Sequence, residues 1–430
     1  MTKTAPTHNA MVSHRSGVIG PIARTVLRTW KGIARIAVPM LVFISDIHLR
    51  AGGRTNVPRV EQLKRFWQRL ETARRDDQVT LCFVGDTFDL VRDPSWFSTP
   101  HRPYHPMTPE LEAQVETLIR ATLVAEKDFF AVLKAQVDSG ALDVKLILGN
   151  HDRMLNEVPG ARVLIRKALG LKGGRDEFPM ELRFEEEGVL AYHGHTADAV
   201  SSNEEGVPFA ELFCPELITR FPLEIRRQLD LQHPHLDDID DVRPVVAVPT
   251  WVRTLAVGEG KGVGEQISKV WAGLVEEFLD NPHVVGWFKA NHRRFHFDFA
   301  SKMKLLLAMS ARRGLKEQSR FAAAHDVLFR LLDTKFASTA AKKLGQKGHE
   351  RLHYVVNGHT HFANMTPLGT LNGGRSCYFN VGTWRTVHQL GHEGAPSFMP
   401  FDAMGYLAFF GKSDPLGREL EWWQGAVLPR

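Results

Sequence analysis

Cysteine is scarce in this chain. Three cysteines occur among 430 residues, at Cys82, Cys214 and Cys377, and none of them forms a CxxC pair. Such spacing argues against a disulfide framework and against a zinc site built from thiolates. It also favours a reducing compartment, where disulfides are rare.

Long apolar runs are absent as well. No run approaches the roughly 20 residues that a helix needs to cross a bilayer, and the first residues lack the uninterrupted hydrophobic segment of a secretory signal. We therefore expect a cytoplasmic protein. The formal net charge of +5 suggests an anionic substrate or partner, although so small an excess on 430 residues also fits simple solubility.

The N-terminal residues 1–38 form a basic extension. Between residues 22 and 38, apolar side chains recur at helical spacing, and Arg24, Arg28, Lys31 and Arg35 fall on the opposite face. Three interpretations remain open for this predicted amphipathic helix. It packs on the protein's own core, it makes peripheral contact with an anionic membrane surface, or it is a targeting leader.

An α/β pattern begins near residue 39. Apolar runs predict strands at residues 41–44, 79–84 and 144–148, with helices at 58–75 and 109–137 between them. Residues 180–184 and 189–192 predict a hairpin. Alternation of strands and helices indicates a largely parallel sheet covered by helices.

The pattern changes after about residue 196, where amphipathic segments follow one another with almost no strand signal until residue 347. Strands are predicted again before residue 358 and at 378–381, 405–410 and 419–423. We therefore divide the chain into an extension (1–38), a first core part (39–200), a helical insertion or cap (201–350) and a second core part (351–430). Within the insertion, the acidic run at residues 237–241 lacks a calcium-loop glycine and is expected to be a solvated turn.

Five of the predicted strands end in chemically similar motifs. These are DIH at 46–48, GDTFD at 85–89, GNHD at 149–152, HGH at 193–195 and GHTH at 358–361. Ligands bind outside the carboxyl ends of strands in open α/β sheets, so the five motifs are expected to converge on one crevice. Glycines beside the polar residues allow a sharp exit from the strand and close approach of the backbone.

The residue types indicate a metal centre. Histidine mixed with carboxylates suits Mn, Fe, Zn or Ni, whereas Mg and Ca prefer oxygen ligands alone. Seven candidate ligands are present, enough for two ions if one carboxylate bridges them: Asp46, His48, Asp86, Asn150, His193, His359 and His361. Two such ions polarise a bridging water to hydroxide and position a phosphoryl group for in-line attack.

The ordered set of motifs resembles the calcineurin-like metallophosphoesterase superfamily, whose pattern is DxH, GDxxD, GNH[DE], H and GHxH. The resemblance covers residues 41–200 and 354–384 but not the insertion. It implies a four-layer α/β sandwich of two mixed β-sheets flanked by helices, interrupted here by a large α-helical insertion. It also implies a metal-dependent phosphoric ester hydrolase with two divalent transition metal ions, of which Mn is preferred over Fe, Zn or Ni.

The resemblance assigns a role to each motif residue. Asp46, His48 and His361 are expected to bind one metal. Asn150, His193 and His359 are expected to bind the other, with Asp86 bridging the two. His151 corresponds to a catalytic histidine that pairs with Asp89. His195 is an alternative to His193 as ligand.

Two further residues near the motifs are expected to be supporting rather than catalytic. Asp152 is expected to hold the loop backbone, and the segment 380–384 to support the site.

The substrate is less well defined by the sequence. Protein Ser/Thr phosphatases of this superfamily carry Arg directly after GDxxD, where this chain has Leu90. UDP-2,3-diacylglucosamine hydrolases place a helical lid between the same two motifs, but this insertion is longer and His151 and His195 depart from their pattern. We therefore expect hydrolysis of a phosphodiester, pyrophosphate or phosphomonoester, nucleotide- or lipid-linked, with the insertion selecting the substrate. The alternatives are a DNA or RNA nuclease and a non-catalytic scaffold.

Overall fold

The fold is taken from a computed structural model of the chain. It describes residues 40–51, 60–74, 78–198, 200–202, 206–291, 299–312, 335–391, 397–411, 414 and 416–427. All of these belong to the compact unit Val38–Arg430. The predicted amphipathic helix at 22–38 lies outside the described residues. No described helix is long and apolar enough to cross a membrane.

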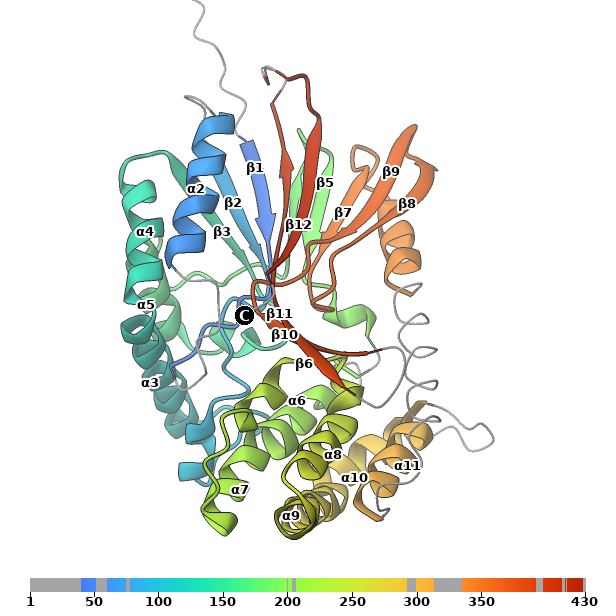
Figure 1. The fold of residues 1–430 in the computed structure, drawn as a ribbon. Coiled ribbons are helices and arrows are strands. Elements are labelled where there is room, and N and C mark those ends of the chain that lie inside the picture. Colours follow the sequence, from blue (N-terminus) through green and yellow to red (C-terminus); the bar gives the residue numbers. More distant parts are fainter. Residues whose placement is uncertain are drawn as a thin grey trace, which may run out of the picture. The chain divides into compact units, whose positions relative to one another are not determined.

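The first sheet has seven strands in the order β3-β2-β1-β11-β10-β6, with β12 paired to β11. Its strands are β1 (Met40–Ile44), β2 (Val79–Val84), β3 (Leu142–Ile147), β6 (Val242–Arg243), β10 (Thr386–Leu390), β11 (Phe398–Phe409) and β12 (Leu420–Val427). Strands β1, β2 and β3 are mutually parallel, and β11 returns antiparallel to β1. The carboxyl ends of the first three strands therefore lie at one edge, as Figure 1 shows.

The second sheet has five strands in the order β4-β5-β7-β9-β8. They are β4 (Glu181–Phe184), β5 (Val189–Tyr192), β7 (Tyr354–Asn357), β8 (Asn364–Leu371) and β9 (Gly374–Asn380). Strands β5, β7 and β9 are parallel, whereas β4 and β8 pair antiparallel with their neighbours. The predicted hairpin at 180–192 is confirmed as β4 and β5.

Alternation along β1 shows how the layers are stacked. Val42 and Ile44 pack into an apolar cluster with the helices, while Leu41 and Phe43 pack into the cluster shared with the second sheet. Because successive side chains of a strand point to opposite faces, a strand buried on both sides must be apolar throughout. This explains the uninterrupted sequence MLVFI.

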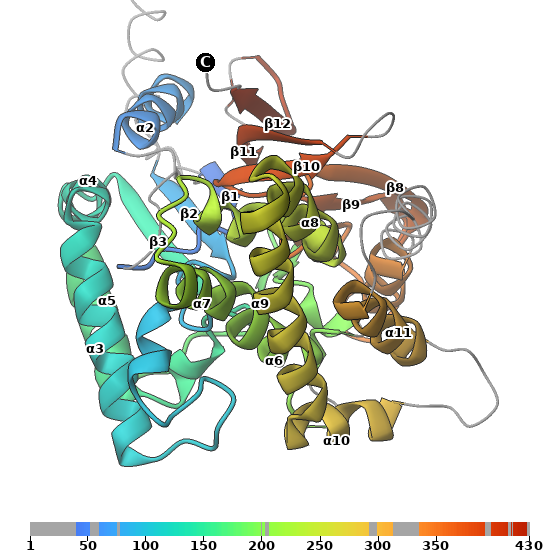
Figure 2. The ribbon, with the colours of Figure 1, turned by 60° about the horizontal axis from the view of Figure 1, so that its bottom comes forward.

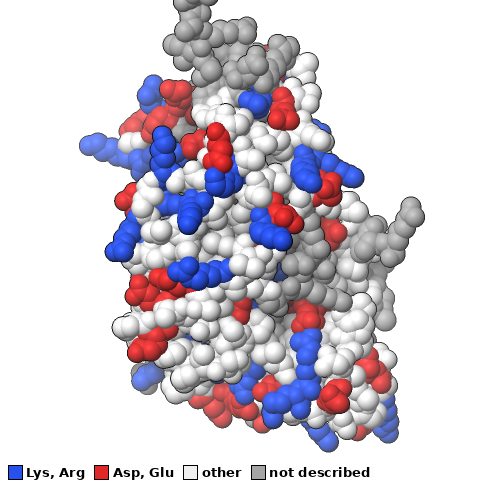
Figure 3. Space-filling model, turned by 90° about the vertical axis from the view of Figure 1, so that its left-hand side faces the viewer, with Lys and Arg blue, Asp and Glu red and all other residues white. Residues whose placement is uncertain are grey.

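Helices cover both outer faces of the two sheets. The first sheet is covered by α2 (Val60–Arg74), α3 (Pro109–Ala125), α4 (Lys127–Asp138) and α5 (Pro159–Leu169). The second sheet packs its other face on a helix at residues 335–344 through Phe336, Ala340 and Leu344. The order is helix, sheet, sheet, helix, so the predicted four-layer class is confirmed. On the side where α3, α4 and α5 lie, Lys and Arg are interspersed with Asp and Glu (Figure 3).

Two local predictions need correction. The single helix expected at 109–137 is two helices, because Glu126 leaves helical geometry with φ −103° and ψ 25°. No glycine or proline marks that break, so the sequence pattern could not place it. Strands β6, β8 and β10 were not predicted; only three of the eight β8 residues are large and apolar.

The insertion forms its own helical layer (Figure 2). It contains α6 (Phe209–Phe213), a π-helical turn (Cys214–Thr219), α7 (Arg220–Leu229), α8 (Val248–Gly258), α9 (Lys261–Asp280), α10 (Pro282–Asn291) and α11 (Phe299–Arg312). Phe209, Trp271 and Phe278 are among the residues of its separate apolar core. The short strand β6 lies inside the insertion yet pairs parallel with β10, which places Val242 beside His388. The insertion therefore contributes a strand to the first sheet.

Candidate metal centre

All five motifs follow the carboxyl ends of strands, three in the first sheet and two in the second. Asp46 and His48 follow β1, Asp86 and Asp89 follow β2, Asn150 and His151 follow β3, His193 follows β5, and His359 and His361 follow β7. Backbone hydrogen bonds join the loops: the amide of His48 donates to Asp86 O at 2.9 Å and that of Gly358 donates to His193 O at 3.0 Å. The amide of His359, after β7, donates to Asp46 Oδ2, after β1, at 2.8 Å, so the two sheets supply one site between them.

The backbone is strained at these positions. Five motif residues other than glycine adopt positive φ angles: Asp46 (54°), His48 (54°), Asp86 (50°), His359 (74°) and His361 (63°). Non-glycine residues rarely adopt this region, and such strain tends to cluster at functional sites. All five residues lie in the motifs DIH, GDTFD and GHTH, and all five are predicted metal ligands.

Glycine is required where the loops approach the side chains most closely. A Cβ on Gly85, which has φ +86°, would lie 2.4 Å from His193 Nδ1. A Cβ on Gly358 would lie 2.2 Å from Asp46 Oδ2. Any larger residue would displace the side chain that it meets, so both glycines are explained by close approach.

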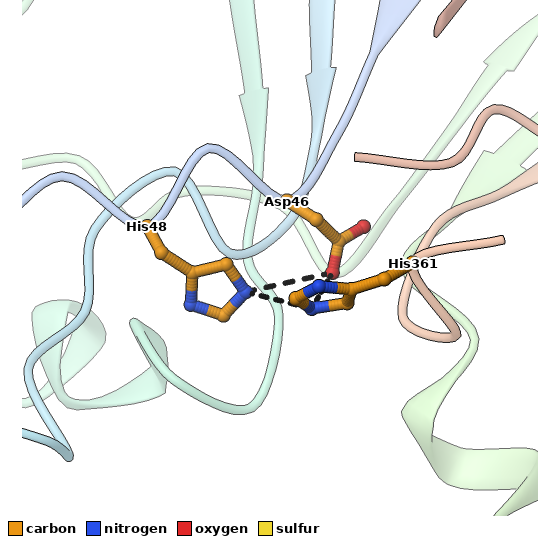
Figure 4. Close-up of side chains that lie close together, drawn as sticks. All are labelled: Asp46, His48 and His361. Atoms are coloured by element: carbon orange, nitrogen blue, oxygen red, sulfur yellow. Dashed lines mark hydrogen bonds and ion pairs between the residues drawn. The ribbon is translucent and has the colours of Figure 1, made fainter. Parts of the chain in front are cut away.

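The first cluster consists of Asp46, His48 and His361, whose ligand atoms lie within 4.8 Å of one another. His48 Nε2 lies 3.1 Å from His361 Nε2, and Asp46 Oδ1 lies 3.7 Å and 3.3 Å from these two nitrogens. Figure 4 shows both rings and the carboxylate directed toward a common point. Three donor atoms arranged in this way fit a single cation.

Burial lowers the pKa of both imidazoles of this cluster, His48 and His361. Burial and the adjacent Arg243 hold the pKa of His361 well below its usual 6.5. A histidine must be unprotonated at the nitrogen that binds a metal, so these shifts favour binding.

The second cluster consists of Asp86, His193 and His359. His193 Nδ1 donates to the carbonyl oxygen of Val84 at 2.8 Å, which leaves Nε2 facing Asp86 Oδ2 at 3.1 Å. His359 Nε2 lies 3.0 Å from Asp198 Oδ2, so Nδ1 is its remaining ligand atom. Partners of this kind fix the orientation and tautomer of metal-binding histidines.

Asp86 belongs to the second cluster and lies close to the first; it also forms a third candidate ligand group with His48 and His151. Its Oδ2 is 3.1 Å from His193 Nε2 in the second cluster and 3.7 Å from His48 Nε2 in the first. Burial alone would raise the pKa of Asp86, but the neighbouring His193 and His151 hold it well below 3.8. An ionised carboxylate in this position suits a ligand shared by two cations.

Several predicted ligand atoms have no hydrogen-bond partner within the protein. They are Asp46 Oδ1, Asn150 Oδ1 and His193 Nε2, all buried. Buried polar atoms are nearly always paired, and each exception calls for an explanation. Bound cations would satisfy all three atoms at once, so the donor set fits a metal centre.

His195 lies beside the second cluster but belongs to none of the ligand groups found among the described residues. Its ring centre is 5.5 Å from that of His193, and its buried Nδ1 has no hydrogen-bond partner. Burial, with His193 and His359 nearby, lowers its pKa to about 3. Only His193 belongs to such a group, and its assignment as the ligand in place of His195 stays a prediction.

The predicted pair of His151 and Asp89 is brought together. His151 Nδ1 lies 2.9 Å from Asp89 Oδ1, and the backbone amide of His151 donates to Asp86 Oδ1 at 2.8 Å. Burial opposes ionisation of Asp89, but Arg92 and His151 hold its pKa well below 3.8. The carboxylate fixes the imidazole so that Nε2 is the atom left to exchange a proton.

Side chains outside the ligand set also hold the motif loops in place through hydrogen bonds to their backbone. Asp152 accepts hydrogen bonds from the amides of Thr87 (2.8 Å) and Gly149 (2.7 Å), which ties the second and third motifs together. Thr383 donates to Asp46 O at 2.6 Å, and Asn380 donates to Gly358 O. Asp152 and the segment 380–384 thus support the site, as their positions in the sequence suggested.

Sequence reasoning missed a set of buried charges around the centre. Four arginines are nearly inaccessible there: Arg50, Arg92, Arg243 and Arg385. The acidic run at 237–241, expected to be a solvated turn, is instead largely buried. Asp240 pairs with Arg50, and Asp241 accepts from Arg385 Nη2 at 2.7 Å. Burial of this run could not be predicted, because the arginines that pair with it lie far away in the sequence.

Asp198 was missed as well, although it follows the HGH motif by three residues. Its hydrogen bond to His359 was not predictable, because the two residues are 161 positions apart. The only sequence signal was an acidic residue close to a predicted ligand.

Comparison with known proteins agrees with the geometry. A family model described as calcineurin-like phosphoesterase matches residues 40–363, which include all five motifs and the whole insertion. No match was found among curated proteins. With three-quarters of its length matched, and with three candidate metal-binding groups among the described residues, two of them containing Asp86, the chain belongs to the calcineurin-like phosphoesterase family and has the features of a metal-dependent phosphoesterase.

Proposed function

We propose that the protein hydrolyses a phosphodiester or pyrophosphate bond of a small or lipid-linked substrate, using two divalent ions, with Mn preferred. The observation that carries this proposal is the carboxylate of Asp86, which lies between two clusters of histidine and aspartate side chains. Mixed nitrogen and oxygen ligands favour Mn, Fe, Zn or Ni over Mg or Ca.

The ligand assignment follows from the two clusters. Asp46, His48 and His361 would hold one ion. His193 and His359, with Asn150 nearby, would hold the other, and Asp86 would be shared. When bound, two such metal ions polarise water and neutralise charge on the phosphoryl group.

The protein's own residues supply orientation and a proton. Asp89 fixes the His151 ring through Nδ1, so Nε2 can hold the proton that the leaving oxygen requires. His151 is 9% exposed, compared with 1% for Asp89, which places it at the accessible side of the pair. Asp198 fixes His359 in the same way that Val84 fixes His193.

A small substrate is favoured over a nucleic acid. Electrostatic binding to a polyanion uses a continuous basic surface; the face over α3, α4 and α5 carries no such surface, because both signs are interspersed there (Figure 3). The arginines beside the centre are buried rather than spread over a surface. We therefore retain the nuclease only as an alternative, together with the non-catalytic scaffold.

A screen with the full-length protein tests this function. Metal content is measured first, and cleavage of bis-p-nitrophenyl phosphate, p-nitrophenyl phosphate, a nucleoside diphosphate sugar and single-stranded DNA is then assayed with Mn. Activity on a diester or pyrophosphate that disappears in Asp86→Ala would support the proposal. A wild-type protein that binds no transition metal and cleaves no phosphoester with Mn supplied would refute it.

Location and membrane contact are part of the same proposal. All three cysteines are free, two of them buried, which supports a reducing cytoplasmic setting. The basic face predicted at residues 22–38 supports peripheral contact with anionic lipid. Flotation with anionic liposomes, with and without residues 1–38, tests that contact, and equal flotation of both proteins would exclude it.

A further inference from the structure

Arg243 carries a buried guanidinium group that forms no ion pair with any carboxylate of the described residues. It is 6% exposed and lies in β6, the strand that the insertion adds to the first sheet. The buried carboxylates around it are bonded to other arginines: Asp89 to Arg92, Asp240 to Arg50, and Asp241 to Arg385. Each of these three carboxylates is thus bonded to another arginine, and none of them pairs with Arg243.

The hydrogen bonds of Arg243 divide its guanidinium into two edges. Nη1 donates to the backbone oxygens of Asp240 and Val242, both at 2.9 Å, which anchors the group to the insertion. The opposite edge faces His361: Nε lies 3.2 Å from Nδ1, and Nη2 lies 3.5 Å from Nε2. The edge that forms paired hydrogen bonds with planar or tetrahedral anions therefore points at the metal centre.

The contact with His361 does not suit the metal-loaded site. Its Nε2 is the atom that meets Asp46 and His48 in the first cluster. An imidazole that binds a metal through one nitrogen keeps its proton on the other. Nδ1 would then be a donor facing the Arg243 Nε–H, which is also a donor, so the guanidinium edge would need another acceptor.

We propose that Arg243 is a substrate-binding residue that donates hydrogen bonds to the phosphoryl oxygens of the substrate beside the ion held by Asp46, His48 and His361. This inference rests on the proposed function, since it requires a phosphoryl group at the centre. A buried, unpaired positive charge is costly, and a phosphoryl anion would supply both the missing charge and two acceptors. The insertion then contributes to substrate binding through the side chain of Arg243 on β6.

The test measures binding of inorganic phosphate to full-length, Mn-loaded protein by titration calorimetry, with metal content determined for every sample. Arg243→Gln removes the charge, and Arg243→Lys keeps the charge but loses the paired geometry. Arg227→Gln is the matched control, because Arg227 belongs to the same insertion but is 69% exposed and pairs with Glu224. Phosphate is the probe because its binding does not depend on which ester the enzyme cleaves.

We expect unchanged metal content in all variants. The phosphate Kd should rise about ten- to hundredfold in Arg243→Gln, as for loss of charged hydrogen bonds. It should rise roughly two- to tenfold in Arg243→Lys, as for loss of one bond, and should not change in Arg227→Gln. If Arg243→Gln does not fold, Arg243→Lys decides the question by the same criterion.

Three outcomes would overturn the proposal. They are a Kd within twofold of wild type in both Arg243 variants, metal loss in both, or a wild-type protein that binds no phosphate. Metal loss would make Arg243 a positioning residue for His361 instead. If the wild type binds phosphate through Arg243 but cleaves no ester in the screen above, the proposed function fails while the binding role of Arg243 stands.

Discussion

Asp89 is the residue whose replacement should reveal most about this site, because it joins the catalytic histidine to the buried arginines. Its Oδ2 accepts from Arg92 Nε at 2.7 Å, and its Oδ1 lies 2.9 Å from His151 Nδ1. Arg50 and Arg385 lie at 4.0 Å and 3.9 Å. Its side chain is 0% exposed, so water cannot replace the carboxylate.

We predict that Asp89→Asn lowers the free energy of unfolding by about 3–5 kcal/mol, the cost of leaving a buried partner charge uncompensated. The change preserves shape, so a cavity does not contribute. The rate constant kcat should also fall by roughly 10²- to 10⁴-fold, because His151 loses the group that fixes its tautomer. Urea unfolding followed by circular dichroism gives the first quantity, and turnover of bis-p-nitrophenyl phosphate gives the second.

Asp143→Asn is the control for the stability measurement. Asp143 pairs with Lys145 at 2.9 Å, but its side chain is 38% exposed. Such a surface pair is worth at most about 1 kcal/mol. If Asp89→Asn lowers the free energy of unfolding no more than Asp143→Asn does, the buried charge cluster does not stabilise the protein as we argue.

The pH dependence provides a second check on Asp89. Its pKa in the folded protein lies well below 3.8, despite burial, because Arg92 and His151 favour the ionised form. Stability from a lowered carboxyl pKa is fully present above the unfolded value and is lost as pH falls toward the folded value. The difference in unfolding free energy between wild type and Asp89→Asn should therefore be constant above about pH 5 and shrink below about pH 4. A difference that instead grew with acidification would contradict the assignment.

Three other predictions concern the metal ligands. Gly85→Ala should abolish binding of one metal, measured by elemental analysis, because the new Cβ would lie 2.4 Å from His193 Nδ1. Gly140→Ala is the control: Gly140 is also at positive φ but has nothing within 4 Å, so this variant should keep both metals, and its free energy of unfolding should fall by only about 1–2 kcal/mol. Equal metal content in the two variants would refute the steric argument. Asp198→Asn should weaken metal affinity by about 10- to 100-fold in a competition assay with a chelator, because the orientation of His359 is lost, and unchanged affinity would show that Asp198 has no such role. Dialysis against EDTA should abolish phosphoesterase activity and lower the melting temperature, with both recovered on adding Mn; full activity after verified metal removal would be inconsistent with a metal-dependent enzyme.

The sequence was most informative where local pattern and chemistry coincide. Each motif combines a buried strand with polar residues directly after it, so the position of the strand end and the candidate ligands are read from the same few residues. Asp46 after β1 and His359 after β7 are examples. The four-layer fold followed from the motif order and the family resemblance, and strand periodicity alone would have supported only an α/β protein.

What could not be predicted depends on contacts between distant segments. Asp240 is separated by 190 positions from Arg50, and Asp241 by 144 from Arg385. A run of acidic residues is ordinarily exposed to solvent. Only the folded structure shows that buried arginines pair with this one. Strand β6 is two residues long and has no pattern of its own. It forms because it can pair with the edge of β10. The local sequence of the insertion does not indicate this pairing.

Strand β6 also bears on how the insertion and the core can move. The ladder to β10, together with the ion pairs of Asp240 and Asp241, would have to break before the insertion could swing away as a hinged domain. We therefore expect insertion and core to melt together, in a single calorimetric transition; two separate transitions would show that they are energetically independent. Turnover would then proceed without large opening and closing of the insertion. Substrate range would be set by a fixed entrance, and exchanging the insertion between relatives would disturb the catalytic core itself.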